Sequence, residues 1–381
     1  MSICGSGPAA EKPGGPAPLI ERKAAFAMTI SPFDHPILSG LLGDEALAAQ
    51  FTARAEIDAV LRFERALAEA EAQEGVIPQA AAEAIAARIS GFSPDINALK
   101  AGTARDGVLV PALVVELRTK LPQAHRAHLH FGATSQDAID TGRALRLKHV
   151  CDILSERLAS LAHGLAALEA RDGAKRVMGH TRMQAAVPVT AARKIRVWRE
   201  PLERHSERLD RVRREIEILH FGGAAGTLDK LGAKGPAVAR RIAVSLGLFP
   251  VDHARHSERD GIADLASLLS LITGSLGKMG QDIALAAQSE MGEIALSDGG
   301  GSSAMPHKKN PVAAETLVAL ARFNATLLSG MHHGLVHENE RSGAAWTLEW
   351  MLLPQMVVAT GTALLRAAEL TGAVTFQPLA R

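Results

Sequence analysis

A polar segment near residue 300 carries the side chains best suited to chemistry. Within nine residues it places two hydroxyls, an ammonium group and an amide, at Ser302, Ser303, Lys308 and Asn310. Glycines precede the serines, and Pro306 and Pro311 exclude regular structure, so we predict a loop that can close over a ligand. The apolar run after Pro311 predicts a helix, and the N-terminus of a helix favours anions. These features indicate a site that binds or activates a carboxylate rather than a simple linker.

Two earlier polar blocks carry side chains of the same kind. The block at 130–137 ends in Thr134, Ser135, Gln136 and Asp137, which could bind a ligand or cap the long helical pattern that follows. The block at 179–190 offers hydrogen-bond donors at His180, Thr181, Arg182 and Gln184. Both blocks precede a long helical pattern, so we expect loops and helix starts to carry the site.

The elements that must position these blocks are helices. Apolar residues make up 47% of the chain, aromatic residues only 3%, and tyrosine is absent, a balance that favours helix-on-helix packing over sheets. Long helical patterns cover 134–170, 189–219, 259–294, 312–336 and 346–370. Shorter ones cover 44–75, 78–89 and 108–121, the last broken by Pro111. We therefore predict an all-α fold with a five-helix bundle.

The predicted domains follow from these patterns. A disordered extension covers 1–30, which is rich in Gly, Pro, Ala and Ser and lacks the apolar core of a secretion signal. A domain of short helices covers 31–133, the central bundle covers 134–373, and a tail covers 374–381. Several bundle helices are apolar on more than one face, which indicates packing against further subunits.

Composition argues against several classes of function. The net charge is +1, and no basic stripe is matched by stacking aromatics, so we expect no nucleic-acid partner. No apolar run reaches spanning length without interruption by charge, so we expect no membrane span and a cytoplasmic protein. Cys4 and Cys151 lack metal or redox spacing. His332, His333 and His337 do not share one helix face, and we expect neither a metal nor an organic cofactor.

The three blocks, in this order, resemble the signature segments of the fumarase/aspartase superfamily, whose members reversibly eliminate a group beta to a carboxylate. In most members the second block resembles Gly-Arg-Thr-His, and its histidine takes part in proton transfer. Here Arg182 stands at the histidine position and His180 at the arginine position. Bacterial 3-carboxy-cis,cis-muconate cycloisomerases also lack that histidine. The segments at 106–114, 221–228, 256–260 and 340–350 are similar to theirs as well.

The resemblance implies closure of a tricarboxylate to 4-carboxymuconolactone, in the protocatechuate branch of the beta-ketoadipate pathway. It also implies a homotetramer with active sites shared between subunits, and a small third domain that this chain lacks. Ser302 is then the expected proton carrier, with Ser303 as the alternative, and His180 is a candidate relay. The expected carboxylate-binding residues are Thr134, Ser135, Thr181, Gln184, Lys308, Asn310, Arg341 and Arg182. Two rival functions are another lyase of adenylosuccinate lyase type and a non-catalytic structural bundle.

Overall fold

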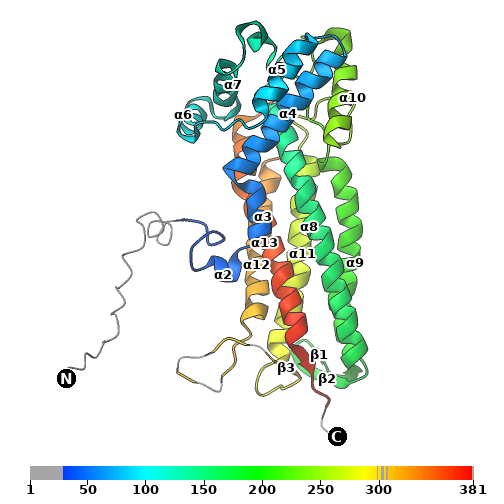
Figure 1. Ribbon diagram of the computed structural model, residues 1–381. Helices are drawn as coiled ribbons and strands as arrows, with labels where there is room; N and C mark the ends of the chain where they lie inside the picture. Colours follow the sequence, from blue (N-terminus) through cyan, green and yellow to red (C-terminus); the bar gives the residue numbers. More distant parts are fainter. Residues whose placement is uncertain (1–28, 298, 302–303, 306–307, 380–381) are drawn as a thin grey trace, which may run out of the picture.

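The computed structural model describes residues 29–297, 299–301, 304–305 and 308–379. Residues 1–28, most of the predicted extension, lie outside this description. Figure 1 shows a bundle of long helices with a layer of short helices over one end. We call the end covered by the short helices the upper end, and the end that carries the small strands the lower end. The predicted all-α fold is confirmed, with small strands as its only departure in the described part of the chain.

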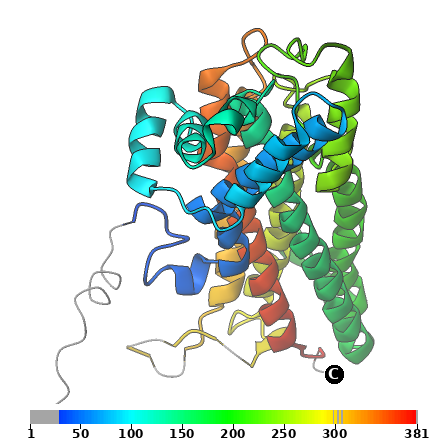
Figure 2. The same ribbon diagram turned by 45° about the horizontal axis from the view of Figure 1, so that its top comes forward.

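Shorter helices lie over the upper end and, in the N-terminal part of the chain, beside the middle of the bundle (Figure 1 and Figure 2). They are α2 (Ser39–Leu42), α3 (Glu45–Ala48), η1 (Ala49–Phe51), α4 (Ala53–Gln73), α5 (Gln79–Ile89), α6 (Ile96–Asp106), α7 (Val110–Thr119), η2 (Gln123–His128), η3 (Gly232–Lys234) and α10 (Gly235–Leu246). The bundle helices are α8 (Ser135–Asp172), α9 (Ala191–Ile216), α11 (Asp260–Ala286), α12 (Val312–His333) and α13 (Gly343–Ala373). The strands are β1 (Arg176–Thr181), β2 (Gln184–Thr190), β3 (Ile294–Leu296) and β4 (Val374–Phe376).

Helix α8 forms one long edge of the bundle core. Its inward side chains recur every three or four residues, the period that lines one face of a helix, and they are fully buried. They include Leu147, Leu154, Leu158, Leu161 and Leu165. Thirty-eight residues at a rise of about 1.5 Å each make α8 about 57 Å long. Any two groups at its opposite ends are therefore too far apart to touch one small molecule.

The chain direction alternates along the bundle. Helices α8, α11 and α13 start at the upper end, whereas α9 and α12 start at the lower end (Figure 1). Consecutive bundle helices therefore run antiparallel, as in up-and-down helical bundles. This alternation determines which motif blocks meet, because each block precedes a helix.

Two hydrophobic clusters fill the interior. One is the bundle core, and the other joins α4, α5 and α7 to α10 and the first turns of α8. The predicted boundary at residue 133 follows chain order, but in space α10 packs with the N-terminal helices. The second cluster thus holds the start of α8 firmly against the short helices.

Four of the predicted element boundaries were wrong. The helix predicted over 44–75 is interrupted at Thr52, whose side chain caps the separate helix α4. Pro111 does not break α7; it stands in the first turn, where its missing N–H would have no intrahelical partner. The helix predicted from 189 begins only at Ala191, because the preceding residues form β2. The helix predicted to reach residue 294 ends at Ala286.

The predicted tail contains an ordered strand. Residues Val374–Phe376 form β4, which pairs antiparallel with β3 at the lower end. Phe376 is buried and stacks on Trp198, with 6.0 Å between the ring centroids. The C-terminal segment therefore closes the lower end of the core.

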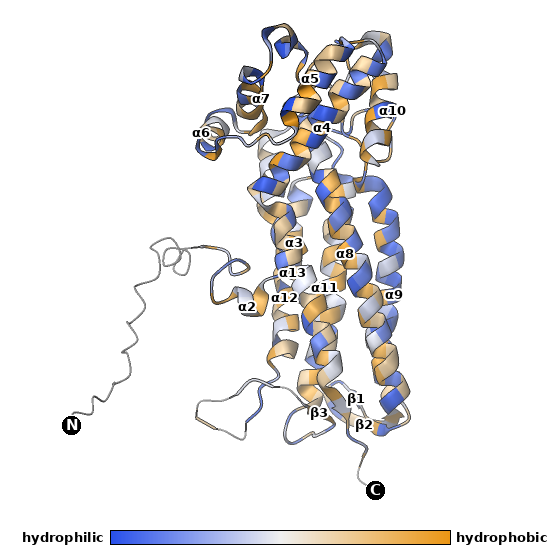
Figure 3. Cartoon of the chain, viewed as in Figure 1, coloured by the Kyte–Doolittle hydropathy of each residue, from blue (hydrophilic) through white to orange (hydrophobic). Residues whose placement is uncertain are grey.

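Three bundle helices are long and strongly apolar. By length and composition alone, α11, α12 and α13 could cross a membrane, although charged residues such as Lys278, Arg322 and Arg366 interrupt them, as the sequence analysis expected. In Figure 3 these helices are largely white and orange, whereas α9 is mostly blue. Of the most apolar stretch, 61% is buried in α11 and in α13, but only 28% in α12. Helix α12 is therefore the least buried of the three within one chain.

Candidate active site

The first block lies at the upper end, where it starts α8. The backbone N–H of Thr134 donates to Asp137 Oδ2 at 2.9 Å, as in a capping box. Thr134 and Ser135 remain partly exposed at the positive end of the helix dipole. This is a suitable place for hydroxyls that bind a carboxylate.

Asp137 ties two further segments to this helix start. Its buried carboxylate accepts hydrogen bonds from the N–H groups of Gly222 and Gly223, at 2.8 and 3.0 Å, and pairs with His256 Nε2 at 2.8 Å. The alternative that Asp137 caps the long helix is thus correct. The same carboxylate also binds the loop at 221–228. The segments at 221–228 and 256–260 both meet the first block at this side chain.

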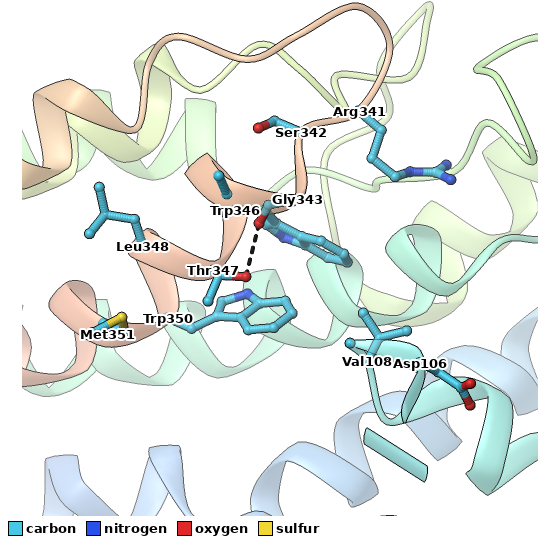
Figure 4. Close-up of a pocket in the computed structure, with 12 residues that line it drawn as sticks. Asp106, Val108, Arg341, Ser342, Gly343, Trp346, Thr347, Leu348, Trp350 and Met351 are labelled. Atoms are coloured by element: carbon cyan, nitrogen blue, oxygen red, sulfur yellow. Dashed lines mark hydrogen bonds between the residues drawn. The ribbon is translucent and has the colours of Figure 1, made fainter. Parts of the chain in front are cut away.

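Arg341 lies beside the first block. Its Nε donates to Gln136 Oε1 at 2.8 Å, and its Nη2 donates to the carbonyl of Ala224 at 3.1 Å. It also lines a cavity of about 720 Å³ formed with the end of α6 and the first turns of α13. In Figure 4 the rings of Trp346 and Trp350 lie next to each other, with Arg341 above them and Asp106 below. A cation beside an aromatic surface is suited to an unsaturated carboxylate.

A buried ion network lies beneath this cavity, and sequence reasoning missed it. Arg259 donates to both oxygens of Glu349, at 2.7 and 2.5 Å, and to Asp140 Oδ2 at 2.9 Å. Arg143 reaches Glu349 at 2.6 Å and Asp140 at 2.9 Å. These four groups join α8, α11 and α13, and their charges balance.

The network keeps its carboxylates ionised although they are buried. Burial alone would raise both pKa values. The guanidinium groups of Arg143 and Arg259 instead hold the pKa of Asp140 well below its usual range and that of Glu349 at about 2. Trp346 Nε1 also donates to Asp140 Oδ1 at 2.9 Å, so the network orients the aromatic floor of the cavity.

A second buried pair supports the beginning of the first block. His130 Nδ1 lies 2.6 Å from Glu64 Oε1, and His130 has a φ of 59°, in the left-handed region. Burial would lower the pKa of His130, but the Glu64 carboxylate raises it overall. His130 is thus hydrogen-bonded within the protein, which favours a structural role for it.

Glu71 is buried beside this pair and should make stability depend on pH. Neither of its oxygens has a hydrogen-bond partner among the described residues, and burial, together with the Glu64 charge, raises its pKa from 4.5 to about 9. The folded protein therefore keeps a proton that the unfolded chain releases above pH 4.5. Stability from this group should decline as pH rises from 4.5 to 9, by up to about 1.4 kcal/mol per pH unit.

Glu71→Gln should remove this decline, so the variant should gain stability over the parent as pH rises. Urea unfolding at a series of pH values measures the effect. Glu69→Gln, on the exposed side of the same helix, is the matched control and should keep the slope of the parent. A parent-like slope in Glu71→Gln would show that Glu71 is not the group responsible.

The second block forms an exposed β-hairpin at the lower end. Strands β1 and β2 pair antiparallel with Thr181 opposite Gln184, and Arg182 and Met183 form the turn with φ values of 48° and 67°. Two-residue hairpin turns require such positive φ, usually from Asn-Gly, and that missing signal explains why the sequence analysis predicted no hairpin. Arg182 is therefore at the tip of a hairpin, and His180, Thr181 and Gln184 are exposed beside it.

A cavity of about 470 Å³ lies behind this hairpin. His180 and Thr181 line it together with Lys194 and Lys278, which form ion pairs with Glu293 and Asp282. Lys194 and Lys278 are thus neutralised by acidic partners, whereas no ion pair of Arg193, which also lines the cavity, is found among the described residues. The cavity does not by itself explain recognition of a substrate with several negative charges.

The third block also lies at the lower end, before α12. Gly300 and Asn310 exchange both backbone hydrogen bonds, at 2.9 and 2.8 Å, and close the loop at its base. The Asn310 amide donates to the Gly301 carbonyl at 3.4 Å, and Lys308 is exposed. Ser302 and Ser303, the expected proton carriers, lie outside the described residues.

The expected site residues are therefore divided between the two ends of one chain. Thr134, Ser135 and Arg341 are at the upper end. His180, Thr181, Arg182, Gln184, Lys308 and Asn310 are at the lower end (Figure 1). Since α8 alone separates these ends by about 57 Å, one chain does not bring the two sets together.

Metal binding was also considered for the histidines after residue 330. His332 and His333 are exposed at the end of α12, whereas the His337 ring is buried, with Nε2 3.8 Å from Glu349 Oε1. In the part of the chain that the structure describes, no three His, Cys, Asp or Glu side chains are arranged to hold a metal ion.

Similarity to known proteins agrees with the motif analysis. A lyase family matches residues 43–323. The 3-carboxy-cis,cis-muconate cycloisomerase of Pseudomonas aeruginosa is 38% identical over 328 residues, which are 84% of this chain and 71% of that relative. The cycloisomerase of Bradyrhizobium diazoefficiens is 38% identical over 335 residues, 86% of this chain and 74% of that relative.

A solved structure shares the whole arrangement. The 3-carboxy-cis,cis-muconate lactonizing enzyme of Pseudomonas putida superposes with a TM-score of 0.84 at 34% identity, over 90% of this chain and 77% of that one. The fold and the family expected from the three blocks are thus confirmed. With a family match over most of its length and relatives of this similarity, the chain belongs to this lyase family.

Proposed function

We propose that the protein is a lactonising 3-carboxy-cis,cis-muconate cycloisomerase. The observation that carries the proposal is its similarity to four cycloisomerases, which are 35–38% identical over 84–86% of this chain. Arg182 at the position where most superfamily members have histidine supports the same assignment over a lyase of adenylosuccinate lyase type.

The reaction forms one bond between oxygen and carbon and one between carbon and hydrogen. A carboxylate oxygen adds to one alkene carbon, and a proton is delivered to the neighbouring carbon, so no atom is lost. The intermediate is a carbanion stabilised as an aci-carboxylate with extra negative charge. Fixed donors must face that carboxylate, and one proton carrier must lie next to the carbon.

The described residues supply donors of the required kinds. Arg341 offers a guanidinium at the cavity of about 720 Å³, and Thr134 and Ser135 offer hydroxyls at a helix N-terminus. Lys308 offers a cation on the loop of the third block, six positions after Ser302 in the sequence, which is the proposed proton carrier. The resulting site has cationic groups for a substrate with three carboxylates.

Because these groups lie at opposite ends of the chain, we propose a homotetramer whose sites combine residues from different subunits. The upper end of one subunit would then meet the lower ends of its neighbours. The apolar stretch of α12, of which only 28% is buried within one chain, supports such packing, because half-buried apolar side chains are stabilised when a neighbouring subunit covers them.

Subunit complementation tests the composite site. Arg341→Ala at the upper end and Ser302→Ala at the lower end should each inactivate the protein. Refolding an equal mixture should restore activity, because some sites then draw intact residues from both variants. Two variants from the same end, Lys308→Met and Ser302→Ala, should not complement to a comparable degree. Light scattering that finds an active monomer would contradict the proposal.

Ultraviolet absorbance tests the reaction itself. Ring closure removes the conjugated diene, so the absorbance of 3-carboxy-cis,cis-muconate should fall when purified protein is added. A constant absorbance, with turnover of an adenylosuccinate-type substrate instead, would favour the other lyase. A constant absorbance with neither substrate would favour the non-catalytic bundle.

A further inference from the structure

The guanidinium of Arg341 uses only one of its edges within the protein. The side edge, made by Nε and Nη2, donates to Gln136 Oε1 at 2.8 Å and to the carbonyl of Ala224 at 3.1 Å. Nη1 donates to no residue that the structure describes, so the end edge, Nη1 with the second hydrogen of Nη2, remains available. A carboxylate can bind that end edge through two parallel hydrogen bonds.

Gln136 has little freedom to turn. Its side chain is buried, and its Nε2 donates to Asp140 Oδ2 at 3.1 Å and to the carbonyl of His256 at 2.8 Å. Both partners can only accept, since the Arg143 and Arg259 guanidinium groups keep Asp140 ionised. The opposite orientation of the amide would place its oxygen against two acceptors. Gln136 Oε1 must therefore face Arg341.

A chain of contacts thus leads from the buried ion network to an exposed arginine. Asp140 is held by Arg143 and Arg259 and in turn orients the Gln136 amide. The same carboxylate orients the indole of Trp346, which forms an edge-on pair with Trp350 in the cavity wall, with 4.7 Å between centroids. One rigid cluster therefore positions both the cation and the aromatic surface of the cavity (Figure 4).

We propose that Gln136 is a positioning residue that holds Arg341 with its free edge toward a substrate carboxylate. An exposed arginine otherwise samples many rotamers and loses that freedom when it binds a ligand. Gln136 restricts the Arg341 side chain before the ligand binds, so binding loses less conformational entropy and the affinity is higher. The inference rests on the proposed function in one respect, namely that the ligand is a compact tricarboxylate.

The experiment is a double-variant cycle on Gln136→Met and Arg341→Met in the full-length protein. Tricarballylate, a saturated tricarboxylate that cannot lactonise, is titrated while tryptophan fluorescence is followed, because Trp346 and Trp350 line the cavity. Gln136→Met should raise Kd about tenfold, the scale of losing one hydrogen bond to a charged group. In the Arg341→Met background the same substitution should change Kd less than twofold, because its partner is gone.

Kinetics separate positioning from a general structural role. With 3-carboxy-cis,cis-muconate, Gln136→Met should raise KM by a similar factor and lower kcat less, since Arg341 binds the carboxylate in both the ground and the transition state. Thr141→Val is the matched control. Thr141 is also buried on α8 and hydrogen-bonds the His220 backbone, at 2.8 and 3.1 Å, but has no contact with Arg341. Thr141→Val should lower Tm about as much as Gln136→Met does, but it should leave Kd unchanged.

Arg341→Lys provides the test from the exposed side, where folding is not at risk. Lysine keeps the charge but lacks the planar guanidinium that Gln136 orients. Kd should therefore rise about as much as in Gln136→Met. Parent-like affinity in Arg341→Lys, or effects of Gln136→Met and Arg341→Met that multiply, would overturn the inference.

The outcomes keep the inference and the proposed reaction distinct. Coupled effects on tricarballylate binding without closure of the muconate would reject the reaction and retain the role of Gln136. If the protein closes the muconate but Gln136→Met and Arg341→Met act independently on Kd, the reaction is retained and the role of Gln136 is rejected. A parent protein that neither binds tricarballylate nor closes the muconate would reject both.

Discussion

Replacing Ser302 with alanine should lower kcat by about two to four orders of magnitude while KM changes little. A positioned proton carrier contributes on this scale, and a role confined to the transition state leaves ground-state binding intact. Ser302 and Ser303 lie outside the described residues, so this expectation rests on the sequence of the loop. The measurement is steady-state kinetics of diene loss, with melting curves recorded beside it.

Two neighbouring variants test whether the effect belongs to Ser302. Lys308→Met should also weaken binding, because it removes a charge that faces a carboxylate in both states. Ser303→Ala should retain most of the turnover. If Ser302→Ala stays active while Ser303→Ala or His180→Ala loses turnover, another residue carries the proton and the family assignment is unaffected.

Glu349→Gln should produce the largest loss of stability, about 3–5 kcal/mol. The substitution removes one of two carboxylates that balance Arg143 and Arg259, and it leaves an uncompensated positive charge between α8, α11 and α13. Urea unfolding at neutral pH measures the loss. Glu369→Gln, in an exposed pair with Arg366 on the same helix, is the matched control and should change stability by less than about 0.5 kcal/mol.

The pH dependence of Glu349→Gln should differ from that of the parent in a specific direction. The folded pKa of Glu349 is lowered from 4.5 to about 2, so its contribution is complete above pH 4.5 and is lost as pH falls toward 2. The parent should therefore lose more stability than the variant on acidification across this window. Equal losses in both proteins, or a destabilisation at neutral pH below about 1 kcal/mol, would contradict the role of the network.

The elements that were predicted correctly depend on local patterns. Apolar residues at helical spacing located all five bundle helices, and the three blocks indicated the family, because both signals lie within short stretches of chain. Helix α10 was missed although its spacing is also local. The hairpin of the second block was missed because Arg182 and Met183 occupy turn positions at which glycine or asparagine normally signals the bend.

The ion network could not be predicted because its members are distant in sequence. Arg143 and Glu349 are 206 positions apart, and Arg259 and Asp140 are 119 apart. A charged residue on a helix usually faces water, and nothing in its immediate neighbourhood shows that a partner from another helix will be buried against it. The contact of Gln136 with Arg341 was missed for the same reason, because the two residues are 205 positions apart.

By itself, the sequence determined the helical class, the family and the residue types that can bind and protonate a carboxylate, because these depend on local spacing and chemistry. Only the tertiary structure decided where those residues lie. Helix direction places the first block and Arg341 at one end of a bundle about 57 Å long and the other two blocks at the opposite end. The physical reason is that the direction of each helix follows from how its apolar face packs against distant parts of the chain, which local pattern does not encode.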